Sequence, residues 1–265
     1  MALPSSGPLS LDDIAGEFGG TAPDTLSEYY GADTIGGVPA SGTLAISDFY
    51  GTSDWPPPID SSFCIFWFPM RNRVGATVSN QVEPGSLTIV GTATQVDKYT
   101  KLSDPSSRAT WQGTPFQDLS FQNNVIEVWI WGNNMENWAV GQENGDKGWA
   151  VGPSFVAKWG INAHAFTSIL GFCSTSDFNC ITYNMTNTSL QVYVNKVLRR
   201  TVAMTGGMLS GGSTTDGYVS ADGLGTSPTA NPNYIADVKL YKNINWTSTQ
   251  VAASYDLQKS YYTPA

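Results

Sequence analysis

The sequence is poor in charge, in histidine and in long apolar runs. Its 265 residues include 13 Lys and Arg against 22 Asp and Glu, giving a formal net charge of −9, and one His. An acidic chain has no basic field with which to release counterions from a phosphate backbone, so nucleic acid is not an expected partner. No stretch of 18 apolar residues occurs, which excludes a membrane-spanning helix and argues against membrane insertion.

Cysteine is also scarce. Three residues, Cys64, Cys173 and Cys180, are an odd and small number for a disulfide framework, and we expect buried reduced thiols. Cys173 and Cys180 are close enough in sequence to pair across a hairpin, which is the alternative. The N-terminus lacks the basic and apolar regions of a secretory signal, so we expect folding in a cytoplasm.

The usual catalytic constellations are missing. The single His164 would have to serve any Ser-His-Asp arrangement, and no Gly-x-Ser-x-Gly turn is present to expose a nucleophile. Zinc is disfavoured because neither C-x-x-C nor H-x-x-x-H occurs. We therefore expect a protein without enzymatic activity and without a required cofactor.

Residues 1–53 contain three copies of a six-residue pattern and no Lys or Arg. The copies are LDDIAG from Leu11, LSEYYG from Leu26 and ISDFYG from Ile46. Ser10 precedes Asp13 by three residues and Thr25 precedes Glu28 by three, which is the spacing of a capping box. Each copy therefore predicts one helical turn, ended by a Gly that favours a left-handed cap.

A single turn is unstable in water, and a Gly- and Pro-rich segment of this length is not expected to build its own core. We therefore expect its apolar residues to dock on a neighbouring subunit or a larger assembly; the alternative is that they pack on the chain's own C-terminal domain. The docking candidates are Leu11, Ile14, Phe18, Leu26, Tyr29, Tyr30, Ile46, Phe49 and Tyr50. Residues 54–60 carry three prolines, which favour a stiff extended linker.

Residues 61–265 are patterned as β-strands. Apolar or alternating runs are separated by Gly, Asn, Asp and Pro, and predict strands at 63–68, 86–90, 125–131, 149–151, 166–171, 189–194 and 235–241. In 125–131, Ile126, Val128 and Ile130 share one face while Glu127, Trp129 and Trp131 share the other. Asn195-Lys196 predicts a tight hairpin turn, and 247–257 predicts a helix. Many short strands indicate an all-β sandwich or jelly roll.

Three runs resemble a known fold family. VIEVWIW from Val125, SLQVYVNKVL from Ser189 and YIADVKLYKNINWTSTQVAASY from Tyr234 are similar to the concanavalin A-like (laminin-G-like) jelly roll in motif order and spacing. Lys196 stands where that hairpin usually has Gly, which strains the turn. The resemblance implies a lectin-like β-sandwich over 61–265.

The N-terminal segment resembles structural proteins of tailed bacteriophages, including tail-associated and fibre-like proteins. The resemblance rests on the opening MALPSSG, on the pattern SGxLxLxDIxxEFGG and on the runs L-S-E-Y-Y and S-D-F-Y-G; its matched residues are Gly7, Leu9, Leu11, Asp13, Ile14, Glu17, Phe18, Gly19 and Gly20. It implies anchoring to other virion proteins through residues 1–53, localisation in a virion assembled in the host cytoplasm, and a homo-oligomer in the particle.

Concanavalin A-like jelly rolls include glycosidases, which need two carboxylates flanking the scissile bond. The strand that would carry the pair has only Glu127, which we expect to be a hydrogen-bonded structural group. Glycan binding is the better prediction, because Trp rings stack on sugars and Asn satisfies hydroxyls. The candidates are Trp131, Asn134, Trp138, Asn144 and Trp149; the alternative is that the Trp side chains fill the core. Asp146, in an oxygen-rich loop, is a weak candidate for Ca²⁺.

The sequence thus predicts a non-enzymatic virion component, tail-associated or fibre-like, that displays a jelly roll for adhesion to a host-surface glycan. The alternative is a capsid or tail decoration (cement) protein whose jelly roll packs on neighbouring virion proteins without binding sugar.

Overall fold

The computed structural model describes most of the chain, in segments separated by short gaps. The described residues are 3–4, 6–20, 22–32, 38–50, 52, 58–70, 73–74, 76–82, 86–96, 99–102, 108–111, 123–132, 140–144, 147–152, 155–158, 162–165, 168–203, 216–219 and 233–262. The chain divides into two compact units, residues 1–57 together with 257–265, and residues 58–256, and each is considered by itself. Most of the predicted linker 54–60 lies outside the described residues.

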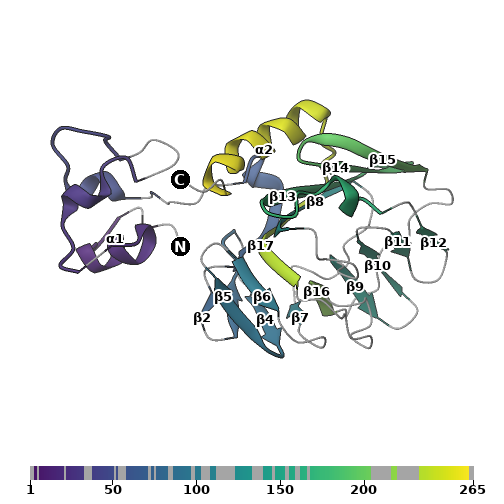
Figure 1. Ribbon diagram of the computed structural model, residues 1–265, viewed down its shortest axis with the longest axis horizontal. Coiled ribbons are helices and arrows are strands. Elements are labelled where there is room, and N and C mark those ends of the chain that lie inside the picture. Colours follow the sequence, from purple (N-terminus) through teal and green to yellow (C-terminus); the bar gives the residue numbers. More distant parts are fainter. Residues whose placement is uncertain are drawn as a thin grey trace. The chain divides into compact units, whose positions relative to one another are not determined.

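The N-terminal unit is built from the three sequence repeats, each of which contains a short helix (Figure 1). These are α1 (Leu11–Phe18), η1 (Leu26–Tyr29) and η2 (Ile46–Phe49), the last two being 3₁₀ turns. The first repeat extends two residues further than its six-residue pattern predicted. The described part of the chain thus confirms a helical turn in every repeat.

All three turns are capped in the same way. The backbone N–H of the residue before each helix donates to the carboxylate three residues later, at 2.8, 2.9 and 2.8 Å respectively: Ser10 to Asp13, Thr25 to Glu28 and Ala45 to Asp48. The Ser10 hydroxyl also accepts from the Asp13 N–H at 3.2 Å, which completes the predicted capping box. Ala45 has no side-chain oxygen with which to do the same.

The prediction that this segment cannot build its own core is wrong. Ile14, Tyr29 and Phe49, one from each repeat, are buried in a single cluster with Leu3 and Val38. The Phe49 ring centroid lies 5.9 Å from that of Phe18 and 6.1 Å from that of Tyr29, both at edge-on angles. Each apolar pair is too small to fold alone, but three repeats cover one another, as repeats do when they stack.

This self-packing changes the docking surface. Ile14, Tyr29 and Phe49 are buried and cannot contact a partner protein. Three other docking candidates pack around them and are partly buried: Leu11, Phe18 and Leu26. Tyr30, Ile46 and Tyr50 remain exposed, at 39, 38 and 36%. Of the nine predicted docking residues, these three alone keep a large exposed side chain.

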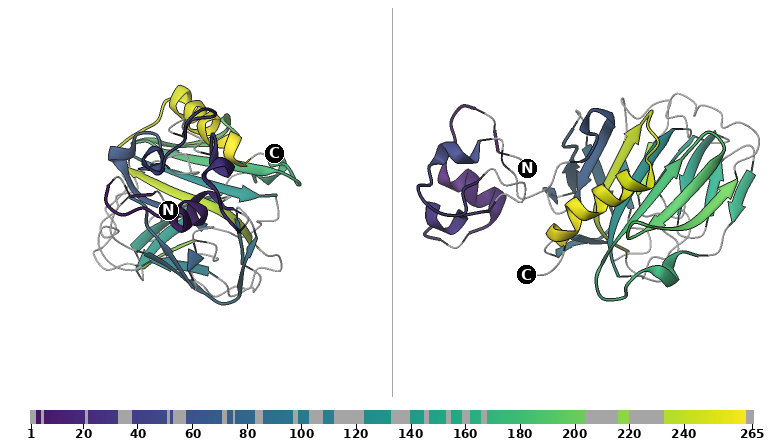
Figure 2. Two further views of the ribbon diagram at one scale, coloured as in Figure 1. Left: turned by 90° about the vertical axis from the view of Figure 1, so that its left-hand side faces the viewer. Right: turned by 90° about the horizontal axis from the view of Figure 1, so that it is seen from above.

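The second unit is a sandwich of two antiparallel sheets (Figure 2). Sheet A contains β1 (Cys64–Pro69), β5 (Ala93–Val96), β6 (Tyr99–Leu102), β8 (Asn124–Trp131), β13 (Phe178–Met185), β14 (Ser189–Val194), β15 (Val197–Ala203) and β17 (Asn233–Lys242). Its order is β15-β14-β13-β8-β17-β6-β5, and β1 also pairs with β17.

Sheet B has the order β12-β11-β10-β9-β16-β7-β4-β3-β2 within the described residues. Its strands are β2 (Arg73–Val74), β3 (Thr77–Ser79), β4 (Ser86–Val90), β7 (Arg108–Trp111), β9 (Val140–Asn144), β10 (Lys147–Val151), β11 (Phe155–Lys158), β12 (Asn162–Ala165) and β16 (Asp216–Val219). Short 3₁₀ turns η3 (Ser61–Phe63) and η5 (Leu170–Phe172) and the helix α2 (Ser248–Tyr262) complete the described elements.

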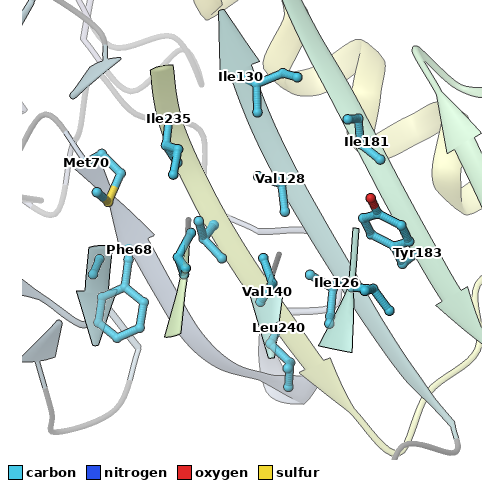
Figure 3. Close-up of a cluster of buried hydrophobic side chains, with 14 of the residues drawn as sticks. Phe68, Met70, Ile126, Val128, Ile130, Val140, Ile181, Tyr183, Ile235 and Leu240 are labelled. Atoms are coloured by element: carbon cyan, nitrogen blue, oxygen red, sulfur yellow. The ribbon is translucent and has the colours of Figure 1, made fainter. Parts of the chain in front are cut away.

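The core lies between the two sheets. The predicted alternation in β8 is confirmed, because Ile126, Val128 and Ile130 all face this core (Figure 3). Val140 of sheet B belongs to the same cluster as Ile181 and Leu240 of sheet A. An apolar layer shared by two antiparallel sheets is the sandwich that the sequence predicted.

Several local predictions can be compared with the observed elements. The hairpin turn is confirmed, with φ of 49° at Asn195 and 63° at Lys196, so a Lys does occupy the left-handed position where Gly would be relaxed. The strand predicted at 166–171 is wrong, because Leu170–Phe172 is a 3₁₀ turn. Within the described residues, no helix is both long enough and apolar enough to cross a membrane.

Candidate functional site: an aromatic surface on sheet A

The outer face of sheet A, opposite the sandwich core, carries alternate residues of each strand. On β8 these are Glu127, Trp129 and Trp131, as the alternation predicted. The register places Trp129 beside Cys180 of β13 and Asp237 of β17, and pairs Trp131 with Phe178. One face of β8 therefore meets side chains from both neighbouring strands.

The residues Ser248–Asp256 of α2 cover the middle of this face. The Ser254 hydroxyl donates to Glu127 Oε2 at 2.6 Å, and the Tyr255 ring stacks on Trp129 with centroids 5.6 Å apart and planes 13° apart. Trp129 is fully buried and Glu127 is 1% exposed. Glu127 is thus hydrogen-bonded and dry, which confirms its expected structural environment and removes it from contact with a soluble polysaccharide.

Beyond the helix, four aromatic residues from four adjacent strands form what we call the outer aromatic patch: Phe178 (β13), Trp131 (β8), Tyr234 (β17) and Tyr99 (β6). Trp131 lies 4.8 Å from Phe178 at 74° and 6.0 Å from Tyr99 at 13°, centroid to centroid. Tyr99 lies 5.5 Å from Tyr234 at 81°. These contacts fix the rings at mutual angles that aromatic pairs favour.

The patch remains open to solvent. Trp131, Tyr99 and Tyr234 are half-buried, whereas Phe178, beside Trp131 on the neighbouring strand, is buried. Lys101, also half-buried, holds its Nζ 5.8 Å from the Tyr234 ring centroid, so a cation lies at the edge of the patch. Partly exposed rings held by their neighbours, with a polar group beside them, can stack on a flat apolar ligand face and hydrogen-bond its rim.

The structure does not bring the five glycan candidates into this one place. Trp131 lies in the patch. Asn144 and Trp149 belong to β9 and β10 of sheet B, where the backbone register pairs Trp149 with Gln142 and Lys147 with Asn144. Asn134, Trp138 and the calcium candidate Asp146 lie outside the described residues.

Sequence reasoning missed three members of the patch. Tyr99 lies in the short strand β6, where Thr100 and Leu102 are buried and Tyr99 and Lys101 are half-buried. This alternation along Y-T-K-L was the signal that could have placed Tyr99 on the outer face of a strand. Tyr234 is the second residue of β17 and was treated only as part of a fold motif. Phe178 starts a strand that was not predicted at all.

Cysteine and metal chemistry have little support in the described part of the chain. Cys64, Cys173 and Cys180 are all buried and free, as expected. Burial raises the pKa of Cys173 to about 11 and that of Cys180 well above its usual value. The described residues contain no group of three or more His, Cys, Asp or Glu placed to hold a metal ion.

Comparison with known proteins identifies the fold and leaves the family open. No family model and no curated protein matches the chain. Among solved structures, the binding domain of botulinum neurotoxin DC in complex with rat synaptotagmin II matches with a TM-score of 0.52 at 12% identity, covering 75% of this chain and 52% of that one. Trypanosoma rangeli sialidase in complex with sialic acid matches with a TM-score of 0.56 at 11% identity, covering 84% of this chain and 36% of that one.

A third match, the botulinum neurotoxin DC binding domain in complex with SialylT, has a TM-score of 0.55 at 12% identity, with 75 and 52% of the two chains covered. The chain spans about half or less of the length of these proteins. At such low identity the likeness extends to the fold alone. The chain contains a lectin-like, jelly-roll type β-sandwich.

Proposed function

We propose that this protein binds carbohydrate through the outer aromatic patch, and that its N-terminal unit attaches it to a larger assembly. The observation that carries the first part is the half-buried Trp131, held by Phe178 and Tyr99 on the outer face of sheet A. Sugar rings present flat C–H faces that stack on such rings. The structures of similar fold include a sialidase bound to sialic acid and a neurotoxin domain bound to SialylT, which supports the same ligand class.

The patch is suited to binding rather than to glycoside cleavage. Cleavage needs two carboxylates on either side of the bond, and the one carboxylate of β8, Glu127, is covered by α2. The chain is therefore proposed to act as a non-enzymatic adhesin.

The assembly that we propose is the virion of a tailed bacteriophage. The support is the resemblance of the first fifty residues to phage structural proteins, together with the exposed Tyr30, Ile46 and Tyr50 of the N-terminal unit. Large apolar side chains left on the surface of a small folded unit are suited to a protein interface. Anchoring by one unit would leave the β-sandwich free for host-surface adhesion.

Glycan-array binding of the full chain tests the ligand class, and Trp131→Ala tests the site. Loss of the stacking ring should weaken binding about tenfold or more, since each 1.4 kcal/mol corresponds to tenfold. The matched control is Phe63→Ala, an aromatic residue that is 41% exposed in η3 and outside the patch; it should bind as the parent does. Equal binding by the Trp131 variant would refute the site, and an array without any bound glycan would favour the decoration role.

A further inference from the structure

Three charged side chains are buried together beneath α2, and no part of the proposed glycan binding uses them. Asp237 and Lys239 are two residues apart on β17 and therefore share its outer face, and Glu127 of β8 is the direct partner of Lys239 in the strand register. Asp237 and Lys239 have no exposed surface, and Glu127 is 1% exposed. Charged residues are almost never buried this completely unless they are paired.

The contacts within the cluster centre on the Lys239 amine. Lys239 Nζ donates to Asp237 Oδ2, and it lies 3.5 Å from Glu127 Oε1. The other oxygen of Asp237, Oδ1, is buried without a hydrogen-bond partner among the described residues. Glu127 is held in place by the Ser254 hydroxyl at 2.6 Å, and the Trp67 ring lies 5.7 Å from Nζ. The Lys239 amine and the carboxyl groups of Asp237 and Glu127 are thus packed together in a buried site beside an aromatic ring.

Ionised groups are disfavoured in this site. Removing each ion from water costs several kcal/mol, and of these three groups only Lys239 carries a positive charge. Burial raises the pKa of Asp237 to about 6, although Lys239 opposes this shift. Burial by itself lowers the pKa of the Lys239 amine, but the nearby carboxylates of Asp237 and Glu127 outweigh burial, and the net pKa is raised. The resting pair is thus ammonium and carboxylate, and the hydrogen bond between them offers a path by which one proton can pass from Nζ to the carboxylate and make both groups neutral at once.

We propose that Lys239 and Asp237 join covalently in a side-chain amide bond, formed by the folded chain itself. The neutral Nζ attacks Cγ of the protonated Asp237 carboxyl, so that a C–N bond forms. A C–O bond of the same carboxyl then breaks, and its oxygen leaves as water after taking up one of the amine protons. No oxidant or other reactant is consumed, because the reaction is a condensation.

Glu127 is placed to move the proton. Its Oε1 is close enough to Nζ to accept a proton from the nitrogen as the bond forms and to return it to the departing oxygen. The product removes two of the three buried charges, so the dry site favours the amide over the separated ions. Because the bond closes a loop of only three residues, its contribution from chain entropy is small.

The test is the intact mass of the purified full chain under denaturing conditions. The proposal expects a mass lower by one water molecule than that of the sequence, and tryptic cleavage blocked after Lys239 but not after Lys242, its neighbour on the same strand. A mass equal to that of the sequence would overturn the proposal without recourse to any variant.

A second route to the same loss of water is a succinimide at Asp237, and it would also overturn the proposal. A succinimide leaves Lys239 free for trypsin and is opened by hydroxylamine, whereas a side-chain amide blocks trypsin and survives hydroxylamine. Glu127→Gln should restore the full mass while keeping a group that Ser254 can hydrogen-bond, and circular dichroism checks that the variant is folded. A dehydrated and folded Glu127→Gln chain would refute the role given to Glu127.

Discussion

The N-terminal unit depends on one phenylalanine for much of its stability, and Phe49→Ala tests this directly. Phe49 is fully buried, and its ring contacts those of Phe18 and Tyr29. These two contacts connect the third repeat to the first and to the second. Truncating a buried Phe to Ala costs about 3–5 kcal/mol. A core of this size rarely supplies more than about 3–5 kcal/mol in total. The substitution should therefore unfold the unit at room temperature.

Hydrogen exchange of the full chain is the assay, since it reports on each unit separately. In Phe49→Ala, we expect protection to be lost throughout α1 and η2 and retained in β8 and β13 of the sandwich. Ile46→Ala is the matched control, because Ile46 lies in the same turn and is 38% exposed; surface truncations usually change stability by about 0.5 kcal/mol or less. Unchanged protection of α1 in Phe49→Ala would refute the shared core.

Three further predictions concern the caps and the thiols. Ala45→Ser should supply the missing cap oxygen at η2 and stabilise the N-terminal unit by about 0.5–1 kcal/mol in denaturant melts; no gain would mean that the turn is not limited by its cap. The pKa of Asp13 is lowered by the hydrogen bonds from Ser10, so its capping contribution is complete above the ordinary value of 3.8 and is lost as the pH falls below it; α1 amide shifts followed by NMR should show this loss, and Asp13→Asn should not. The three cysteines, Cys64, Cys173 and Cys180, are buried and free, so thiol titration should find almost no reaction in the native chain and three reactive groups after denaturation. A single reactive group after denaturation would indicate that two of them form a disulfide.

The sandwich was predictable from sequence wherever one face of a strand is apolar. In β8 the apolar residues Ile126, Val128 and Ile130 alternate with Glu127 and two Trp, and that alternation is what the structure contains. The strand β13, by contrast, was not predicted although all eight of its residues are buried. Its outer face carries Asn and Thr, which sequence patterns assign to loops. Asn184 is nevertheless satisfied, since it donates to the Trp246 carbonyl at 2.7 Å and accepts from the Trp246 N–H at 3.1 Å.

The N-terminal core escaped prediction for a different reason. Each repeat was judged alone, and a single turn with one apolar pair is unstable. The pairs have partners, however, in the other two repeats, and the relation between repeats is a tertiary fact that spacing within one repeat does not reveal. The repeat pattern itself contained the signal, since three equivalent positions, Ile14, Tyr29 and Phe49, carry the three most deeply buried side chains of the helices.

The outer face of sheet A owes its two chemistries to the extent of one helix. The strands β8 and β17 supply the buried charges and also Trp131 and Tyr234 of the outer aromatic patch. Where α2 lies over them, Ser254 and Tyr255 exclude water from Glu127 and Trp129, and charge becomes costly enough for condensation to be favoured. Two residues further along β8, Trp131 is beyond the helix and keeps an exposed surface for a ligand. A helix that extended over Trp131 would leave a stable sandwich without the proposed binding surface, so how far α2 reaches along this face is itself a determinant of the proposed function.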